Sequence, residues 1–181
     1  MWDGRAETRA QSMCPYCDTD FFSHTMETSE SILHRLAQLR SPGSEWVWVS
    51  GGEPALQLDT QLLDGLHRDG YRVAVETNGT IAFRPGVAEL LDHLTMSPKR
   101  PFEETVVRRV NTLKILWPHP NPRIRPERFA GIEAQFRFLQ PIEVNGQPSA
   151  TKANLDSAID HLNQLRGWRL SVQLHKLIGV D

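Results

Sequence analysis

The chain has few cysteines, lacks any long apolar run and carries almost no net charge. Its 181 residues include only two cysteines, and no apolar stretch approaches the roughly 20 residues of a membrane-spanning helix. The formal charge of −2 argues against binding nucleic acid or an anionic membrane through net charge. The first residues, with Asp3 and Arg5, contain no apolar stretch and do not resemble a signal peptide. We therefore expect a cytoplasmic protein.

The hydrophobic pattern predicts a single α/β domain over residues 1–181. This length is most simply one domain, and we find no internal repeat or low-complexity tail. Strands and helices alternate along the sequence, which favours a mostly parallel sheet. Helices are predicted at residues 27–40, 59–69, 86–93 and 153–165, and strands at 45–49, 71–75, 111–117, 134–139 and 168–174.

Polar loops follow the predicted strands and the short run Leu94-Thr-Met96, and their positions point to a ligand site. They are Ser50-Gly-Gly-Glu-Pro54, Glu76-Thr-Asn-Gly79, Ser97-Pro-Lys99 and Gln140-Pro141. Because the carboxyl ends of parallel strands meet at one edge of a sheet, where such folds bind ligands, we expect these loops to form one ligand mouth.

Each of these features also has a plainer interpretation. Gly51 and Gly52 could form a simple turn before a helix. Glu76 and Lys99 could be solvated surface charges, and His175 could be a half-buried histidine without a ligand. The tryptophans Trp46, Trp48 and Trp168 are interpreted as core or interface residues.

The two cysteines form a single C-x-x-C, Cys14-Pro-Tyr-Cys17. In a reducing compartment such a pair indicates metal or redox chemistry rather than a structural disulfide. A zinc site needs four ligands, and beyond His24 the nearby sequence supplies no further pair. A thioredoxin-like pair needs a preceding strand, which residues 9–13 do not predict.

Considered together, the motifs resemble the radical S-adenosylmethionine (SAM) superfamily. Cys14-Pro-Tyr-Cys-Asp-Thr-Asp-Phe21, Ser-Gly-Gly-Glu-Pro54, Glu-Thr-Asn-Gly-Thr80, Ser-Pro-Lys99, Leu-Gln-Pro141 and Gln-Leu-His-Lys176 occur in order. More narrowly, the chain is similar to the 7-carboxy-7-deazaguanine synthases of queuosine biosynthesis. The resemblance implies a modified, incomplete (β/α) barrel, here lacking its first strand.

The resemblance also implies a reaction. A 4Fe–4S cluster held by three thiolates would bind SAM and cleave it reductively to a 5′-deoxyadenosyl radical. That radical would start the ring contraction of 6-carboxy-5,6,7,8-tetrahydropterin to 7-carboxy-7-deazaguanine, with loss of ammonia and with Mg²⁺ steering the rearrangement.

Several roles are implied for the residues around the C-x-x-C. Cys14 and Cys17 would bind the cluster, Tyr16 would meet the SAM adenine, and Asp18 would belong to the same SAM-contacting turn. Thr19 would be the protein's Mg²⁺ ligand, an oxygen donor suited to that hard cation.

The strand-end loops would bind SAM. Gly52 and Glu53 would receive its methionine end, and Glu76 would bind its ribose. Ser50, His175 and the terminal carboxylate of Asp181 are implied on the pterin side. The loops closing over SAM comprise Ser97, Pro98, Lys99, Gln140, Pro141, Ile142 and Glu143.

The family implies a homodimer and a flavodoxin- or ferredoxin-type reductant. Its cysteine spacing, C-x14-C-x2-C, would place a first cysteine just before Met1, so we expect an N-terminally truncated sequence. Two cysteines alone do not supply three thiolates. The alternatives are a non-catalytic SAM- or pterin-binding remnant, or another radical SAM enzyme such as an activase.

Overall fold

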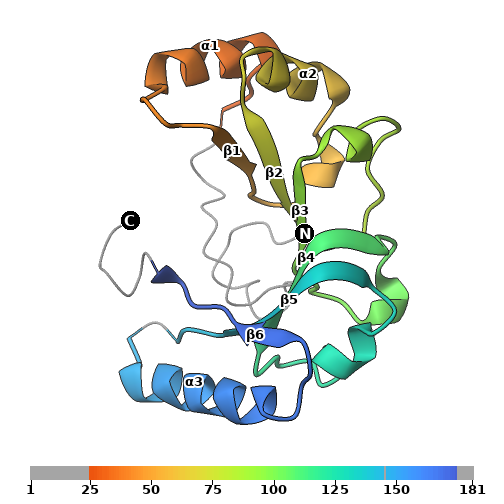
Figure 1. The fold of residues 1–181 in the computed structure, drawn as a ribbon, viewed down its shortest axis with the longest axis vertical. Coiled ribbons are helices and arrows are strands. Elements are labelled where there is room, and N and C mark those ends of the chain that lie inside the picture. The colour runs from red at the N-terminus through yellow and green to blue at the C-terminus, as the bar shows by residue number, and fades with distance from the viewer. Residues whose placement is uncertain (1–24, 145, 175–181) are drawn as a thin grey trace.

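The computed structural model describes residues 25–144 and 146–174, which form one parallel sheet with helices (Figure 1). The strands are β1 (Trp46–Val49), β2 (Arg72–Thr77), β3 (His93–Met96), β4 (Arg109–Trp117), β5 (Glu133–Pro141) and β6 (Trp168–Leu170). The α-helices of this part of the chain are α1 (Ser29–Leu39), α2 (Thr60–Arg68) and α3 (Pro148–Leu162). In the described residues no helix has the length and apolar character needed to cross a membrane.

The strand order across the sheet is the same as the order along the chain, β1 to β6, and every neighbouring pair is parallel. Right-handed crossovers that always step in one direction place their connections on one face of the sheet. A doubly wound sheet would instead reverse its strand order partway. The sheet is therefore part of a barrel wall, which confirms the predicted α/β class and agrees with an incomplete barrel.

The helices begin where side chains bind their free backbone amides. Thr28 accepts a hydrogen bond from Ser31 N (3.2 Å) at α1, and Asp59 accepts one from Leu62 N (2.9 Å) at α2. α3 was expected to begin at residue 153 but begins at Pro148. Proline is favoured in a first helical turn, where its missing N–H costs no hydrogen bond.

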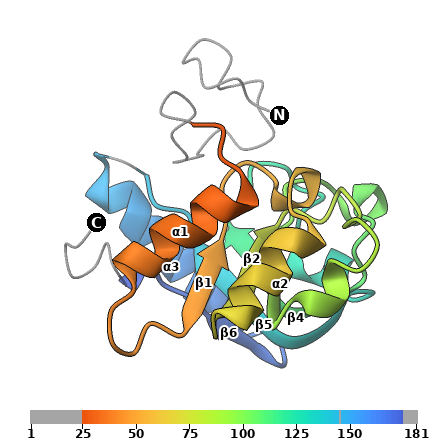
Figure 2. The ribbon, with the colours of Figure 1, turned by 90° about the horizontal axis from the view of Figure 1, so that it is seen from above.

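The core lies between the helices and one face of the sheet. α2 contributes Leu63 and Leu66, which pack on Val73 and Val75 of β2. Figure 2 shows α1 and α2 lying beside one another over β1 and β2. Other fully buried members of this core are Met96, Leu113, Ile115, Ile124, Phe129 and Leu139.

Two further predicted elements differ from the structure. The helix expected at 86–93 is only a 3₁₀ turn at Ala88–Leu90, because Asp92 already joins the sheet. Its backbone N–H donates to Val73 O (3.0 Å) and its side chain accepts from Val73 N (2.8 Å).

The strand expected at 168–174 ends at Leu170. Leu139 O accepts a hydrogen bond from Ser171 N, and Ile142 N donates to Trp117 O on the opposite side of β5. Pro141 is thus the next residue of β5 that would donate toward β6, and it has no N–H.

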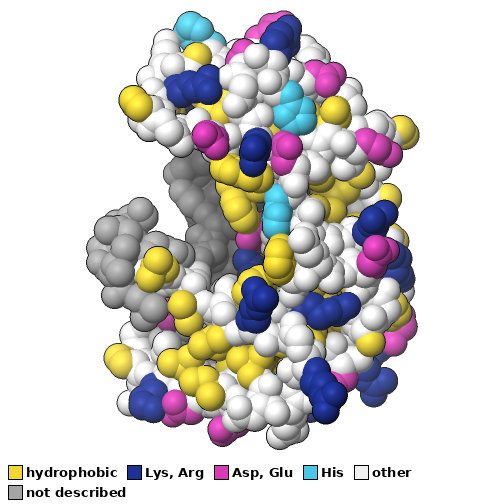
Figure 3. Space-filling model, viewed as in Figure 1, with side chains coloured by type: hydrophobic (Ala, Val, Ile, Leu, Met, Phe, Trp, Pro, Cys, Tyr) yellow, Lys and Arg dark blue, Asp and Glu magenta, His cyan; other side chains and the backbone are white. Residues whose placement is uncertain are grey.

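The second face of the sheet, here called the inner face, carries aromatic and polar side chains. Register places Trp48, Ala74 and His93 in one row and Lys114 beside Phe138 in another. Hydrophobic side chains are exposed over the middle of the sheet in Figure 3. Trp46 and Trp48 are 45% and 56% exposed, so the prediction of core packing is wrong for both, and an interface role stays a prediction.

Candidate functional site

The structure brings the four polar loops to one edge of the sheet, here called the rim: residues 50–54, 76–80, 97–99 and 140–143. The first two loops are joined by the carboxylate of Glu53, which is only 5% exposed. Glu53 Oε1 accepts hydrogen bonds from Thr77 Oγ1 (2.7 Å) and Ala55 N (3.2 Å), and Oε2 accepts one from Asn78 N (2.8 Å). Glu53 therefore holds the rim together, and its predicted contact with SAM stays a prediction.

Beside Glu53 the backbone is open. Ser50, Gly51 and Gly52 are exposed, and Gly51 has a φ of +112°. A Cβ atom built on Gly51 would meet no atom within 4 Å, so the space is open, but L-residues rarely adopt this conformation. The loop thus offers backbone groups that a ligand can approach closely.

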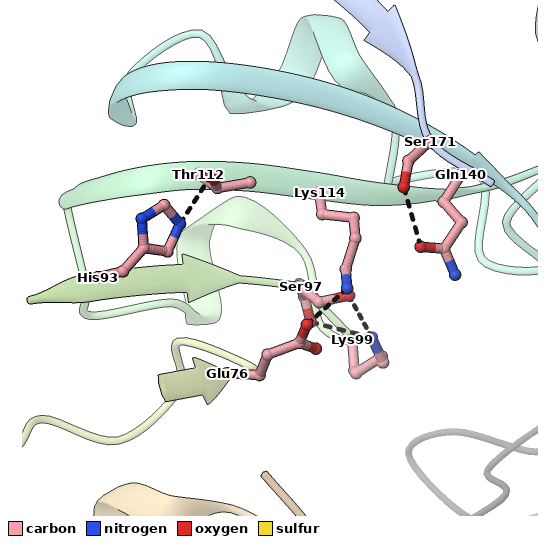
Figure 4. A network of polar contacts seen from close by, with 8 residues as sticks. All are labelled: Glu76, His93, Ser97, Lys99, Thr112, Lys114, Gln140 and Ser171. Atoms are coloured by element: carbon pink, nitrogen blue, oxygen red, sulfur yellow. Dashed lines mark hydrogen bonds and ion pairs between the residues drawn. The ribbon is translucent and has the colours of Figure 1, made fainter. Parts of the chain in front are cut away.

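The centre of the rim is an ion pair between Glu76 of β2 and Lys114 of β4 (Figure 4). Lys114 Nζ lies 2.7 Å from Glu76 Oε1, and both side chains are partly buried. The pair crosses over β3, which lies between the two strands. Glu76 was predicted as a ribose-binding residue, whereas Lys114 was not singled out.

Lys99 folds back onto the loop that carries it. Its Nζ donates to Ser97 Oγ (2.6 Å) and to Ser97 O (3.0 Å). These two hydrogen bonds hold the Lys99 side chain against its own loop. His119, in the loop after β4, lies close enough to respond to this charge. Burial, and secondarily the positive charge of Lys99, lower the pKa of His119 to about 4, so its imidazole is neutral near pH 7.

The fourth loop continues the rim beyond β5. Ser171 Oγ donates to Gln140 Oε1 at 3.5 Å, a long contact that links the ends of β5 and β6. Pro141 ends β5, and Asn154 of α3 donates to Ile142 O (2.7 Å). Glu143 follows and is half-buried. This loop is therefore fixed against α3.

Deeper on the inner face, His93 and Thr112 share a 3.1 Å hydrogen bond. Burial lowers the pKa of His93, and the Trp48 ring lies 6.3 Å away, between ring centroids. At Trp48, His93 and Thr112 the inner face thus carries aromatic and neutral polar groups.

Two residues that contact or lie beside the rim, Lys114 and His119, were not predicted from the sequence. A usable signal existed for Lys114, because a lysine in the apolar strand 111–117 needs a partner when its strand lies in the middle of a sheet. His119 lies in a proline-rich connection with no local pattern to distinguish it.

Seven predicted site residues lie outside the described residues: Cys14, Tyr16, Cys17, Asp18, Thr19, His175 and Asp181. Their predicted roles at the cluster, SAM, Mg²⁺ and the substrate are not tested. Within residues 25–144 and 146–174, no group of three or more His, Cys, Asp or Glu side chains could hold a metal ion.

Known proteins resemble this chain along almost all of its length. The 7-carboxy-7-deazaguanine synthase of Bordetella pertussis is 35% identical over 190 aligned positions, covering 99% of this chain and 84% of that protein. The enzyme of the same name from Bradyrhizobium diazoefficiens is 36% identical, again over 99% of this chain and 84% of that protein. No protein-family model matches the chain.

Among solved structures, the crystal structure of QueE from Escherichia coli superposes with a TM-score of 0.54 at 24% identity. The match covers 81% of this chain, and the chain spans 64% of that structure's length. This likeness supports the fold alone. The sequence relatives show more than the fold. Because they are 35–36% identical to this chain over 99% of its length, the chain belongs to the 7-carboxy-7-deazaguanine synthase family of enzymes.

Proposed function

We propose that this protein converts 6-carboxy-5,6,7,8-tetrahydropterin to 7-carboxy-7-deazaguanine, with loss of ammonia, in the biosynthesis of queuosine. The observation that carries the proposal is the 35% identity to the Bordetella pertussis synthase over 99% of the chain. The polar rim supports it independently, because parallel α/β folds bind their ligands at this edge.

The rim has the chemistry that SAM requires. The exposed backbone at Gly51 and Gly52 suits the amino and carboxylate groups of the methionine part. The Glu76 carboxylate suits the ribose hydroxyls, which are hydrogen-bond donors. Residues 97–99 and 140–143 would close over the cofactor. The inner face, with its neutral His93, offers an aromatic and polar surface beneath.

The remaining cofactors would be held by residues near the N-terminus. Cys14 and Cys17 would provide thiolates to a 4Fe–4S cluster, which with SAM supplies one-electron reductive chemistry when bound. Tyr16 and Asp18 would contact SAM, and Thr19 would bind Mg²⁺. On the substrate side we place Ser50, His175 and Asp181. We further propose a cytoplasmic homodimer that receives electrons from a flavodoxin- or ferredoxin-type protein.

Anaerobic reconstitution tests this function. Protein expressed from its complete reading frame is loaded with iron and sulfide, then given SAM, dithionite, Mg²⁺ and the tetrahydropterin. We expect 7-carboxy-7-deazaguanine by mass spectrometry, its loss in Cys14→Ala, and unchanged turnover in Lys152→Met, which alters an exposed pair on α3.

Two results would contradict the proposal in different ways. A protein that binds stoichiometric iron and sulfide yet forms no product with this pterin would be another radical SAM enzyme. A protein that binds SAM but no cluster would be a non-catalytic binding module.

A further inference from the structure

The Glu76–Lys114 pair is built across an intervening strand. Glu76 is in register with Thr95 of β3, and Thr95 with Thr112 of β4. Lys114 comes two residues after Thr112, so it lies on the same face of the sheet as Glu76 and nearer to the rim. Two strand spacings separate β2 from β4, about 9–10 Å. Only long side chains that extend toward each other span this gap, which fixes the direction of both.

The pair uses only one of the two carboxylate oxygens of Glu76. Lys114 Nζ bonds Oε1, and among the described residues no hydrogen bond to Oε2 is present. The side chains of Lys114 and Glu76 are 19% and 29% exposed, so the pair is partly but not fully removed from solvent. The oxygen that remains at the rim is an acceptor with a fixed position.

An acceptor in a fixed position favours a ligand with neighbouring donors. The vicinal hydroxyls of a ribose donate two hydrogen bonds in nearly one direction, which a carboxylate can accept. A glutamate side chain that is ordered before binding avoids the entropic cost of being ordered by the ligand. The net contribution of an ion pair to folding is small when the pair is exposed and is offset by desolvation when it is buried, which leaves this ordering as the main effect of the pair.

We propose that Lys114 is a positioning residue, which orients the Glu76 carboxylate toward the ribose hydroxyls of a bound adenosyl ligand. The inference rests on the proposed function, since it takes SAM as the ligand at the rim. Lys114 acts through Glu76 and need not touch the ligand.

The test is ligand binding without turnover. S-adenosylhomocysteine and its 2′,3′-dideoxyribose analogue are titrated calorimetrically into wild type, Lys114→Met, Glu76→Gln and the double variant. Lys114→Met keeps most of the length of the side chain, which becomes one atom shorter, and removes its charge. Lys152→Met is the matched control, because Lys152 forms a 2.6 Å pair with Asp156 that is exposed on α3.

We expect Lys114→Met to weaken S-adenosylhomocysteine binding about fivefold to tenfold, the effect of ordering one side chain on binding. Binding of the dideoxy analogue should stay within about twofold of wild type, since that ligand has no hydroxyls for Glu76 to accept from. The double variant should bind no more weakly than Glu76→Gln alone. Lys114→Gln replaces Lys114→Met if the latter does not fold.

Equal losses for both ligands in Lys114→Met would mean a general structural role and would overturn the inference. So would unchanged binding of both ligands in that variant while Glu76→Gln weakens S-adenosylhomocysteine. If Glu76→Gln binds S-adenosylhomocysteine like wild type, or wild type does not bind it, the ribose assignment in the proposed function fails as well.

Discussion

Thr77 Oγ1 donates a 2.7 Å hydrogen bond to Glu53 Oε1, so the end of β2 and the loop after β1 share one buried carboxylate. Two backbone amides, of Ala55 and Asn78, complete the set of donors. A carboxylate so enclosed is stable only while its donors remain in place, and the donors in turn depend on it.

Replacing Glu53 should therefore destabilise the protein strongly. Glu53→Ala leaves three donors without their acceptor, and we expect a loss of about 3–5 kcal/mol in the free energy of unfolding. Glu53→Gln keeps an acceptor and should lose about 1–2 kcal/mol. Urea denaturation measures both, with the exposed Glu45→Gln as control. An Ala variant as stable as that control would refute the role in holding the rim.

Gly79, in the loop after β2, should resist substitution more than another glycine with the same backbone conformation. Its φ is +79°, and a Cβ there would come within 2.9 Å of Met96 Sδ. Gly43 has a φ of +86°, but a Cβ there would meet nothing within 4 Å.

Both alanine variants pay the left-handed strain of about 1–2 kcal/mol, and Gly79→Ala should lose about 1–3 kcal/mol more from overpacking. Thermal unfolding of the two variants measures the difference. Equal losses would show that Met96 moves aside without cost.

Ser157 should contribute to the attachment of α3. Trp117 Nε1 donates a 3.0 Å hydrogen bond to Ser157 Oγ, and the Trp117 ring stacks on His161 at 4.2 Å between centroids. Ser157→Ala leaves the indole N–H without this acceptor and should cost about 1 kcal/mol. Ser149→Ala, exposed on the same helix, is the control for helix propensity and should not be destabilising. Chemical denaturation followed by tryptophan fluorescence reports both.

His119 should make the protein less stable in mild acid. Its pKa is lowered to about 4 in the folded protein from an ordinary value of 6.5, chiefly by burial and then by the charge of Lys99. The unfolded chain therefore binds this proton more readily. The resulting stabilisation is complete above about pH 6.5 and is lost as the pH falls toward 4.

The full shift corresponds to about 3 kcal/mol, which partial exposure to solvent reduces to about 1–2 kcal/mol. His119→Asn keeps an acceptor for the Asn121 N–H that now bonds His119 Nδ1. We expect the stability difference between wild type and this variant to shift by that amount between pH 7 and pH 4.5. A constant difference, or a His119 NMR titration near 6.5, would contradict the assignment.

The elements were predictable where local pattern decides them. The apolar spacing in α1 and α2 and the apolar run of β1 depend on near neighbours in sequence, and their predicted limits lie within two residues of those observed. The 86–93 segment was not predictable in this way, because Asp92 is fixed by Val73 on another strand. The end of β6 likewise depends on Pro141, a residue of its neighbour.

The rim likewise has features that could be predicted from local sequence and features that depend on residues far apart in the chain. Four loops could be assigned to one edge from the alternation of strands and helices, which predicts a parallel sheet whose strands share their carboxyl ends. Glu76 and Lys114, however, are 38 residues apart and meet across β3, so their pairing follows from register and side-chain length rather than from any motif.

The sequential strand order also has a consequence for how the chain is made. Each strand from β2 to β6 pairs with the strand synthesised just before it. A chain leaving the ribosome can therefore extend its sheet at one growing edge, and no later strand has to be inserted between two earlier ones. Each pairing spans a single crossover connection rather than the length of the whole chain. The edge that grows during synthesis is the one that the next strand will cover.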